Sequence, residues 1–186
     1  MTDRKNINVA TLCLVYSVSF LTALVLYHVL TMIGLLVGIT ISSAHPFIFL
    51  AVFVLANYCL ALKYIENQKV AEYLIISYLL FALLVVGSLA LARAFYDFGP
   101  DSQTAHLLGI VHLTQGWNPV WDPAFRDASN DYPLKPAVVD LWQINYVAAA
   151  GKLSYFLMAG IVSATGNIED GKLVNWLFMA TLLAFA

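Results

Sequence analysis

The sequence predicts an all-α polytopic membrane protein, and three observations support this fold class. Only 20 of the 186 residues, 11%, are charged, whereas soluble domains carry about 25%. Hydrophobic residues make up 61% of the chain, and the mean hydropathy is +0.81. Residues 6–62 form a run of 57 residues without Asp, Glu, Lys or Arg. This composition excludes a disordered chain, and the net charge of −2 excludes a nucleic-acid partner, which needs a basic surface.

The uncharged run is long enough for two membrane-spanning helices. As a single helix it would be roughly 85 Å long, against a hydrocarbon core of about 30 Å. The break falls at residues 40–46, where small polar residues meet Pro46. We therefore predict transmembrane helices at 9–36 and 47–62. A third follows at 73–92, where 20 residues carry no charge.

The basic residues predict the orientation of these helices. Arg4 and Lys5 precede the first predicted helix, and Lys63 and Lys69 lie between the second and the third. The turn at 40–46 has no Lys or Arg. The positive-inside rule then gives a cytoplasmic N-terminus. We expect a multi-pass protein of the cell (inner) membrane, with the loop 93–137 in the periplasm or outside the cell.

The predicted external loop is rich in acids and prolines. Residues 97–140 contain six of the eleven acids and five of the six prolines. An amphipathic helix is predicted at 101–115, beginning after Pro100 and ending at Gly116, and we expect it to lie in the membrane interface. Trp117 and Trp121 follow in a turn and suit the headgroup level.

The rest of the chain predicts two further helices. Residues 138–166 form an interfacial or membrane helix that is interrupted by Asp140 and Lys152. Residues 168–170 are expected to cap the next helix, at 168–186, whose apolar part is too short to cross a bilayer. We interpret it as the start of a truncated transmembrane helix, and the chain as the N-terminal fragment of a longer polytopic protein.

Asp97 and Asp101 follow the third predicted helix and lie four residues apart. A carboxylate at the membrane surface can act as a general base, or can hold a metal ion that neutralises a phosphate leaving group. The alternative is that Asp101 is a helix N-cap and Asp97 a solvated loop acid. His106 either hydrogen-bonds a phosphate or orients Asp101, or it is a surface histidine.

Several cations are candidates for binding an anionic substrate. Lys152 has apolar neighbours and needs a partner or a path to the interface. A fixed positive charge near the bilayer surface suits a lipid-linked phosphate. Arg93, Arg126 and Lys135 are candidates for the same task, with membrane anchoring as the alternative. His28, inside the first predicted helix, is expected to make a helix–helix hydrogen bond. His112 is expected to lie at the surface.

A group of motifs resembles a known family. They are YDFGPDSQTAH at 96–106, GWNP at 116–119, GK at 151–152, TGNIE at 165–169 and GKLVN at 171–175. Together they resemble the first external loop and the following helices of the GT-C class of membrane glycosyltransferases, in particular the bacterial relatives of the dolichyl-phosphate-mannose protein mannosyltransferases. Ala105 stands where the family has an aromatic residue, and two extra predicted spans precede the usual first one.

The resemblance implies an inverting transfer at the external face of the membrane. The donor is a polyprenyl-phosphate-linked sugar in the lipid bilayer, and the acceptor is a glycan, a lipid or a protein. No cofactor is certain, and a divalent metal ion stays open because the family includes members with and without one. We expect no transfer from these 186 residues alone. The implied catalytic residues are Asp101 and, second, Asp97, and the implied substrate-binding residues are His106, Lys152, Lys135 and Arg93.

The competing interpretation is a non-enzymatic polytopic membrane protein, either a transporter or an envelope-assembly subunit. Transporters show broken helices and ionisable residues within their spans. The three predicted helices offer only His28, which favours the enzyme.

Overall fold

Three long apolar helices dominate the computed structural model, which describes residues 8–94, 107–121 and 153–185. They are α1 (Val9–Leu36), α2 (His45–Tyr64) and α3 (Val70–Ala94), the last preceded by the short turn η1 (Asn67–Lys69). Each is long and apolar enough to cross a membrane. The described residues contain no strand. The prediction of a helical protein with three such helices is therefore confirmed.

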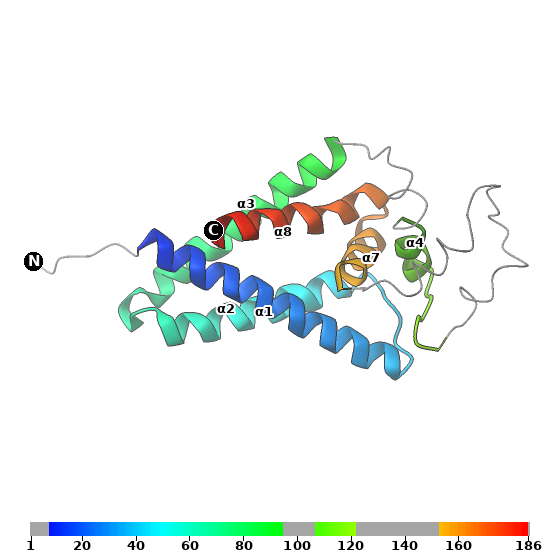
Figure 1. The fold of residues 1–186 in the computed structure, drawn as a ribbon, viewed down its shortest axis with the longest axis horizontal. Helices are drawn as coiled ribbons and strands as arrows, with labels where there is room; N and C mark the ends of the chain where they lie inside the picture. The colour runs from blue at the N-terminus through cyan, green and yellow to red at the C-terminus, as the bar shows by residue number, and fades with distance from the viewer. Residues whose placement is uncertain (1–7, 95–106, 122–152, 186) are drawn as a thin grey trace, which may run out of the picture.

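The other described elements are shorter. They are α4 (Leu107–Thr114), α7 (Leu153–Thr165), η3 (Ile168–Lys172) and α8 (Leu173–Phe185). Figure 1 shows α8 running alongside α3, and α4 and α7 gathered at one end of the long helices. α8 packs against α3 and α1, and α7 packs against α2 and α4.

The bounds of α2 and α3 extend two to three residues beyond the predicted ones at each end. α1 covers the same residues as the first predicted span, 9–36. α2 begins at His45, with Pro46 in its first turn, because proline loses no hydrogen bond there. α3 begins at Val70 and has Glu72 in its first turn. An acid in that position is favoured by the positive end of the helix dipole. Glu72 therefore lies within α3 and does not mark its start.

Glycine ends α1 and α4 in the same way. Gly38 follows α1 with φ 88° and Gly116 follows α4 with φ 89°. The next residue then turns back onto the helix: the N–H of Ile39 donates to the Gly34 carbonyl at 2.8 Å, and the N–H of Trp117 to the His112 carbonyl at 2.9 Å. This is the Schellman arrangement, which needs a left-handed residue. α4 therefore ends before Gly116, and α1 ends before the 40–46 turn.

Aromatic rings fill the space between the long helices. The Phe49 ring of α2 lies edge-on to Phe20 and Tyr27 of α1, with centroids 5.7 and 5.8 Å apart. Phe53, one turn further along α2, stacks on Phe81 of α3 at 4.6 Å. Such ring pairs contribute about 0.5–1.5 kcal/mol beyond the area they bury, so these contacts fix how α1, α2 and α3 pack.

A buried polar group also joins α2 to α3. The Asn57 amide donates to the Ser77 hydroxyl at 2.8 Å, and the Tyr73 hydroxyl donates to the Asn57 amide oxygen at 2.8 Å. All three residues are fully buried. A polar side chain inside a membrane bundle needs such a partner, and these bonds therefore hold the two helices in one register.

Of the helix predicted at 101–115, the structure describes the part that forms α4, and residues 101–106 lie outside the described residues. Ile110 and Leu113 are buried in the hydrophobic core, so this side of α4 faces the rest of the bundle. His112 was expected at the surface but is half-buried, and burial lowers the pKa of its imidazole.

His28 does not make the expected hydrogen bond. Its Nδ1 is buried without a partner among the described residues. The ring instead stacks on Phe156 of α7, with centroids 5.4 Å apart. A neutral imidazole can pack as an aromatic ring, so His28 joins α1 to α7 through ring contact.

Candidate functional site

One end of the bundle collects the elements that carry the predicted site. Here α1 ends at Leu36, α2 begins at His45 and α3 ends at Ala94; we call it the Arg93 end. α4, α7 and η3 lie at this end (Figure 1). α3, the last described element before the acid-rich segment in the sequence, therefore ends here.

The charged centre of the Arg93 end is a two-bond ion pair between α3 and η3. Arg93 Nε donates to Asp170 Oδ1 at 2.7 Å, and Arg93 Nη2 donates to Asp170 Oδ2 at 2.8 Å. The Asp170 side chain is fully buried, whereas 52% of the Arg93 side chain is exposed. The planar guanidinium matches the carboxylate in this arrangement, and it ties the end of α3 to the turn before α8.

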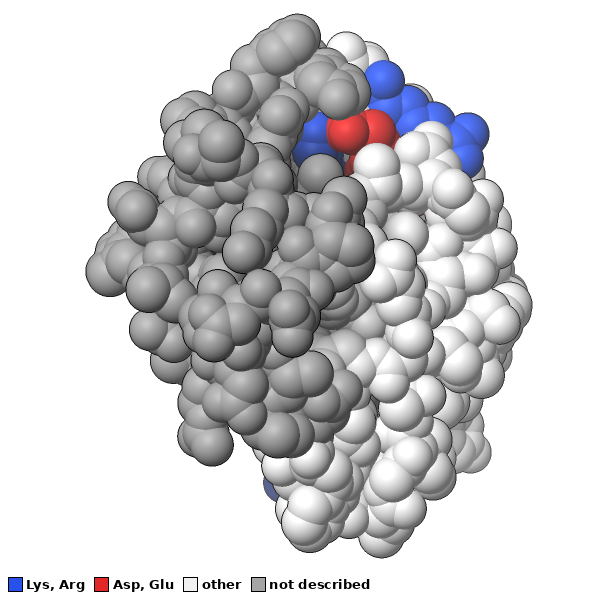
Figure 2. All heavy atoms as spheres, turned by 90° about the vertical axis from the view of Figure 1, so that its right-hand side faces the viewer, with Lys and Arg blue, Asp and Glu red and all other residues white. Residues whose placement is uncertain are grey.

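A second ion pair lies beside the first. Lys172 pairs with Glu169, three residues earlier in η3. Figure 2, which looks onto the Arg93 end, shows acidic and basic groups side by side at the upper edge, while most of the other described surface in this view is uncharged. The Arg93 end thus concentrates charge next to an apolar bundle.

Gly171 lets η3 pack closely against α7. A Cβ at this position would lie 3.3 Å from Val162 Cγ2 and 3.4 Å from Met158 Cβ. The turn begins at Asn167, whose side-chain oxygen accepts the Glu169 N–H at 3.1 Å. The predicted cap at 168–170 is therefore wrong by one residue, because the capping side chain is Asn167.

The ion pair changes the acidity of Asp170. Hydrogen bonds from Arg93 lower the pKa of the Asp170 carboxyl, although burial acts in the opposite direction. Asp170 also lies just before α8, where the helix dipole favours a negative charge. Asp170 is consequently ionised at neutral pH, and its charge is used to hold Arg93.

The segment after α4 is attached to the end of α1. The Asn118 amide donates to the Leu35 carbonyl at 2.8 Å, and the Trp121 indole N–H donates to the Leu36 carbonyl at 3.0 Å. The last carbonyls of a helix lack partners within it, so these side chains satisfy them. Trp117 was expected at the headgroup level, but it is 8% exposed and packs in the core, whereas Trp121 is 64% exposed.

Five of the six candidate site residues fall outside the part of the chain that the structure describes. Only Arg93 is described, and it is bound to Asp170. Within the described residues there is no group of three or more His, Cys, Asp or Glu side chains that could hold a metal ion. The five candidates outside are Asp97, Asp101, His106, Lys135 and Lys152.

Comparison with known proteins gives no relative. No family model, curated protein or solved structure matches this chain. The function must therefore be argued from its own residues and from the geometry of the Arg93 end.

Sequence reasoning missed Asp170 and Asn118. The sequence predicts that Asp170 belongs to a helix cap, and its neighbours give no sign of a partner 77 residues away. Asn118 lies between Trp117 and Pro119. This pattern indicates a turn, but it does not indicate that Asn118 contacts α1. The charge of Asp170 could have indicated its role, since an acid beside an apolar run requires a basic partner.

Proposed function

We propose that the protein is an inverting membrane glycosyltransferase that uses a polyprenyl-phosphate-linked sugar. The observation that carries this proposal is the position of α3. It ends at the charged Arg93 end, and Asp97 and Asp101 follow Ala94 by three and seven residues in the sequence. An acid-bearing segment that directly follows a charged helix end in the sequence suits chemistry on a lipid-linked phosphate.

The proposed reaction uses Asp101 as general base, with Asp97 as the second candidate. The base removes the proton from an acceptor hydroxyl, whose oxygen attacks the anomeric carbon of the sugar. The bond from that carbon to the phosphate oxygen breaks with inversion, and the polyprenyl phosphate leaves with the electron pair. Such proton transfer contributes about 10²–10⁴-fold to a rate.

The leaving phosphate needs positive charge or hydrogen-bond donors. Lys152, Lys135 and His106 are the proposed donors, and a divalent metal ion is an alternative. Arg93 is a fourth candidate. Two of its five N–H donors bond Asp170, while half of its side chain is exposed, so the ion pair would hold the guanidinium in place for a phosphate.

The proposal is tested with the full-length protein, radiolabelled polyprenyl-phosphate sugars and an Asp101→Asn variant. We expect transfer to fall by at least about 100-fold, because the amide cannot accept the hydroxyl proton. Asp122→Asn, which removes another acid of the same loop, is the matched control and should keep normal transfer. Normal transfer by Asp101→Asn would exclude Asp101 as the base.

The same experiment addresses the alternative function. If the wild-type protein neither turns over nor binds any of the lipid-linked sugars, a transporter or an envelope-assembly subunit becomes the better interpretation.

A further inference from the structure

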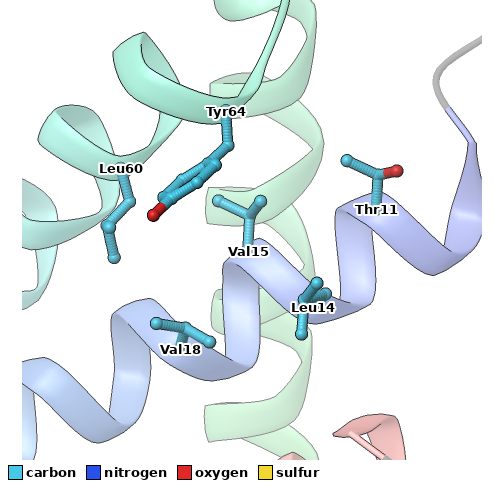
Figure 3. Close-up of a pocket in the computed structure, with 6 residues that line it drawn as sticks. All are labelled: Thr11, Leu14, Val15, Val18, Leu60 and Tyr64. Atoms are coloured by element: carbon cyan, nitrogen blue, oxygen red, sulfur yellow. The ribbon is translucent and has the colours of Figure 1, made fainter.

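An apolar groove lies between α1 and α2, far from the Arg93 end. It has a volume of about 330 Å³ and is lined by Thr11, Leu14, Val15 and Val18 of α1 and by Leu60 and Tyr64 of α2. Figure 3 shows these side chains gathered between the two helices. The groove is close to the Lys63 end of the bundle, where α1 begins at Val9, α2 ends at Tyr64 and α3 begins at Val70.

The groove is open to the surroundings of the bundle. Leu14 and Tyr64, on its two walls, are 51% and 57% exposed. Both helices are apolar enough to cross a membrane, so hydrocarbon surrounds this surface. From Thr11 to Val18 the groove covers about 10 Å of α1, one third of the hydrocarbon thickness. It can therefore hold the part of an acyl chain nearest its headgroup.

A positive charge lies beside the groove. Lys63 precedes Tyr64 in the last turn of α2, and its ammonium lies 5.2 Å from the centre of the Tyr64 ring. None of the ion pairs in the described part of the chain uses Lys63. Lys69, in contrast, pairs with Glu66 at 2.9 Å. The groove thus combines apolar walls with a nearby cation, and this combination suits a lipid with an anionic headgroup.

We propose that the groove binds an anionic phospholipid, with one acyl chain between α1 and α2 and the phosphate on the Lys63 ammonium. The lipid belongs to the leaflet that surrounds the Lys63 end. This site is independent of glycosyl transfer, because the proposed reaction takes place at the Arg93 end.

Native mass spectrometry of the purified protein tests whether the site prefers an anionic headgroup. Phosphatidylglycerol and phosphatidylcholine with the same acyl chains are added in detergent, and we expect more phosphatidylglycerol to be retained. Lys63→Gln should reduce this preference by about fivefold, since one lysine near a membrane contributes about 1 kcal/mol. Lys69→Gln is the matched control and should leave the preference unchanged. Equal retention of both lipids by the wild-type protein would overturn the proposal.

A second variant tests the groove itself. Val18→Phe fills the groove and should reduce the retention of both lipids. Val25→Phe adds the same ring to α1 outside the groove, at a position that is 57% exposed, and should have no effect. Unchanged retention by Val18→Phe would show that the lipid binds elsewhere, even if Lys63→Gln removes the preference for phosphatidylglycerol.

Discussion

The Arg93–Asp170 pair combines a buried carboxylate with a half-exposed guanidinium. The Asp170 side chain is fully buried, while 52% of the Arg93 side chain is exposed. An ionised carboxylate without a partner is costly to bury, so Asp170 depends on Arg93. Arg93 can remain solvated by itself, and the two residues therefore respond differently to substitution and to pH.

Removing the Asp170 charge should destabilise the protein at neutral pH. We expect Asp170→Asn to lower the free energy of unfolding by about 2 kcal/mol at pH 7, which is the scale of hydrogen bonds to charged groups. The pKa of Asp170 is lowered in the folded protein. The stabilisation is therefore present above the unfolded value of about 3.9 and is lost as the pH falls through the lower folded value.

The measurement is thermal unfolding in detergent, followed by tryptophan fluorescence between pH 7 and pH 3. The difference between wild type and Asp170→Asn should shrink towards pH 3. Glu66→Gln is the control, because the Glu66 side chain is 77% exposed and a surface pair contributes at most about 1 kcal/mol. A pH-independent difference would contradict the assignment.

The contribution of the Tyr73–Asn57 hydrogen bond to the free energy of unfolding should also be measurable. We expect Tyr73→Phe to cost about 1 kcal/mol, in the range for hydrogen bonds between membrane helices, because it leaves the buried Asn57 oxygen without its donor. A double-mutant cycle with Asn57→Ala should show coupling. Tyr58→Phe, at a position that is 46% exposed, should change little. Additive effects of Tyr73→Phe and Asn57→Ala would contradict this role.

At the level of elements, α7 approaches the start of α2 closely at Gly160. A Cβ at Gly160 would lie 2.7 Å from His45 Cβ and 3.1 Å from Pro46 Cδ. Small residues allow membrane helices to approach in this way. The packing of α7 on α2 therefore depends on the missing side chain of one glycine.

Gly160→Ala should force α7 away from α2 and cost about 1–3 kcal/mol, as overpacking does. Gly87→Ala is the matched control, because a Cβ at Gly87 would meet nothing within 4 Å. That control should be neutral or stabilising by up to about 1 kcal/mol. Unfolding by heat in detergent measures both variants, and equal stabilities would contradict the close contact.

The elements were more predictable than their contacts. Charge-free runs predict the long helices because the length and hydropathy of a membrane helix can be read from its own residues, without information about the helices it packs against. The aromatic contacts of Phe53 and the bond between Asn118 and Leu35 depend on how distant segments pack, which a single sequence does not encode locally. The Arg93–Asp170 pair also depends on the packing of distant segments, so Asp170 could not be predicted as the partner of Arg93. The position of Arg93 at the end of the third helix could be predicted.

At the level of the whole molecule, α3 is the most exposed long helix. Only 11% of its most apolar 18-residue window is buried, against 39% for α1 and 33% for α2. Leu79, Leu83 and Val86 are each more than 60% exposed. An apolar surface of this kind requires lipid or another helix around it, which agrees with a membrane protein.

The predicted orientation can be tested by cysteine labelling. Ser43, between α1 and α2, and Gln68, between α2 and α3, are both exposed. In a Cys13→Ser, Cys59→Ser background, a membrane-impermeant maleimide should label Ser43→Cys in intact cells but Gln68→Cys only after permeabilisation. This follows from the positive charges of Lys63 and Lys69. The reverse pattern would put the Arg93 end, and the proposed reaction, in the cytoplasm.

The links at the Arg93 end also have a consequence for biosynthesis. Asn118 is made 83 residues after Leu35, and Asp170 is made 77 residues after Arg93. At about 5–20 residues per second, Asp170 is synthesised about 4–15 s after Arg93. During that interval the first three helices can enter the membrane, while the end of α3 carries a cation without its partner. Assembly of the Arg93 end is therefore a late step, after insertion of α1, α2 and α3.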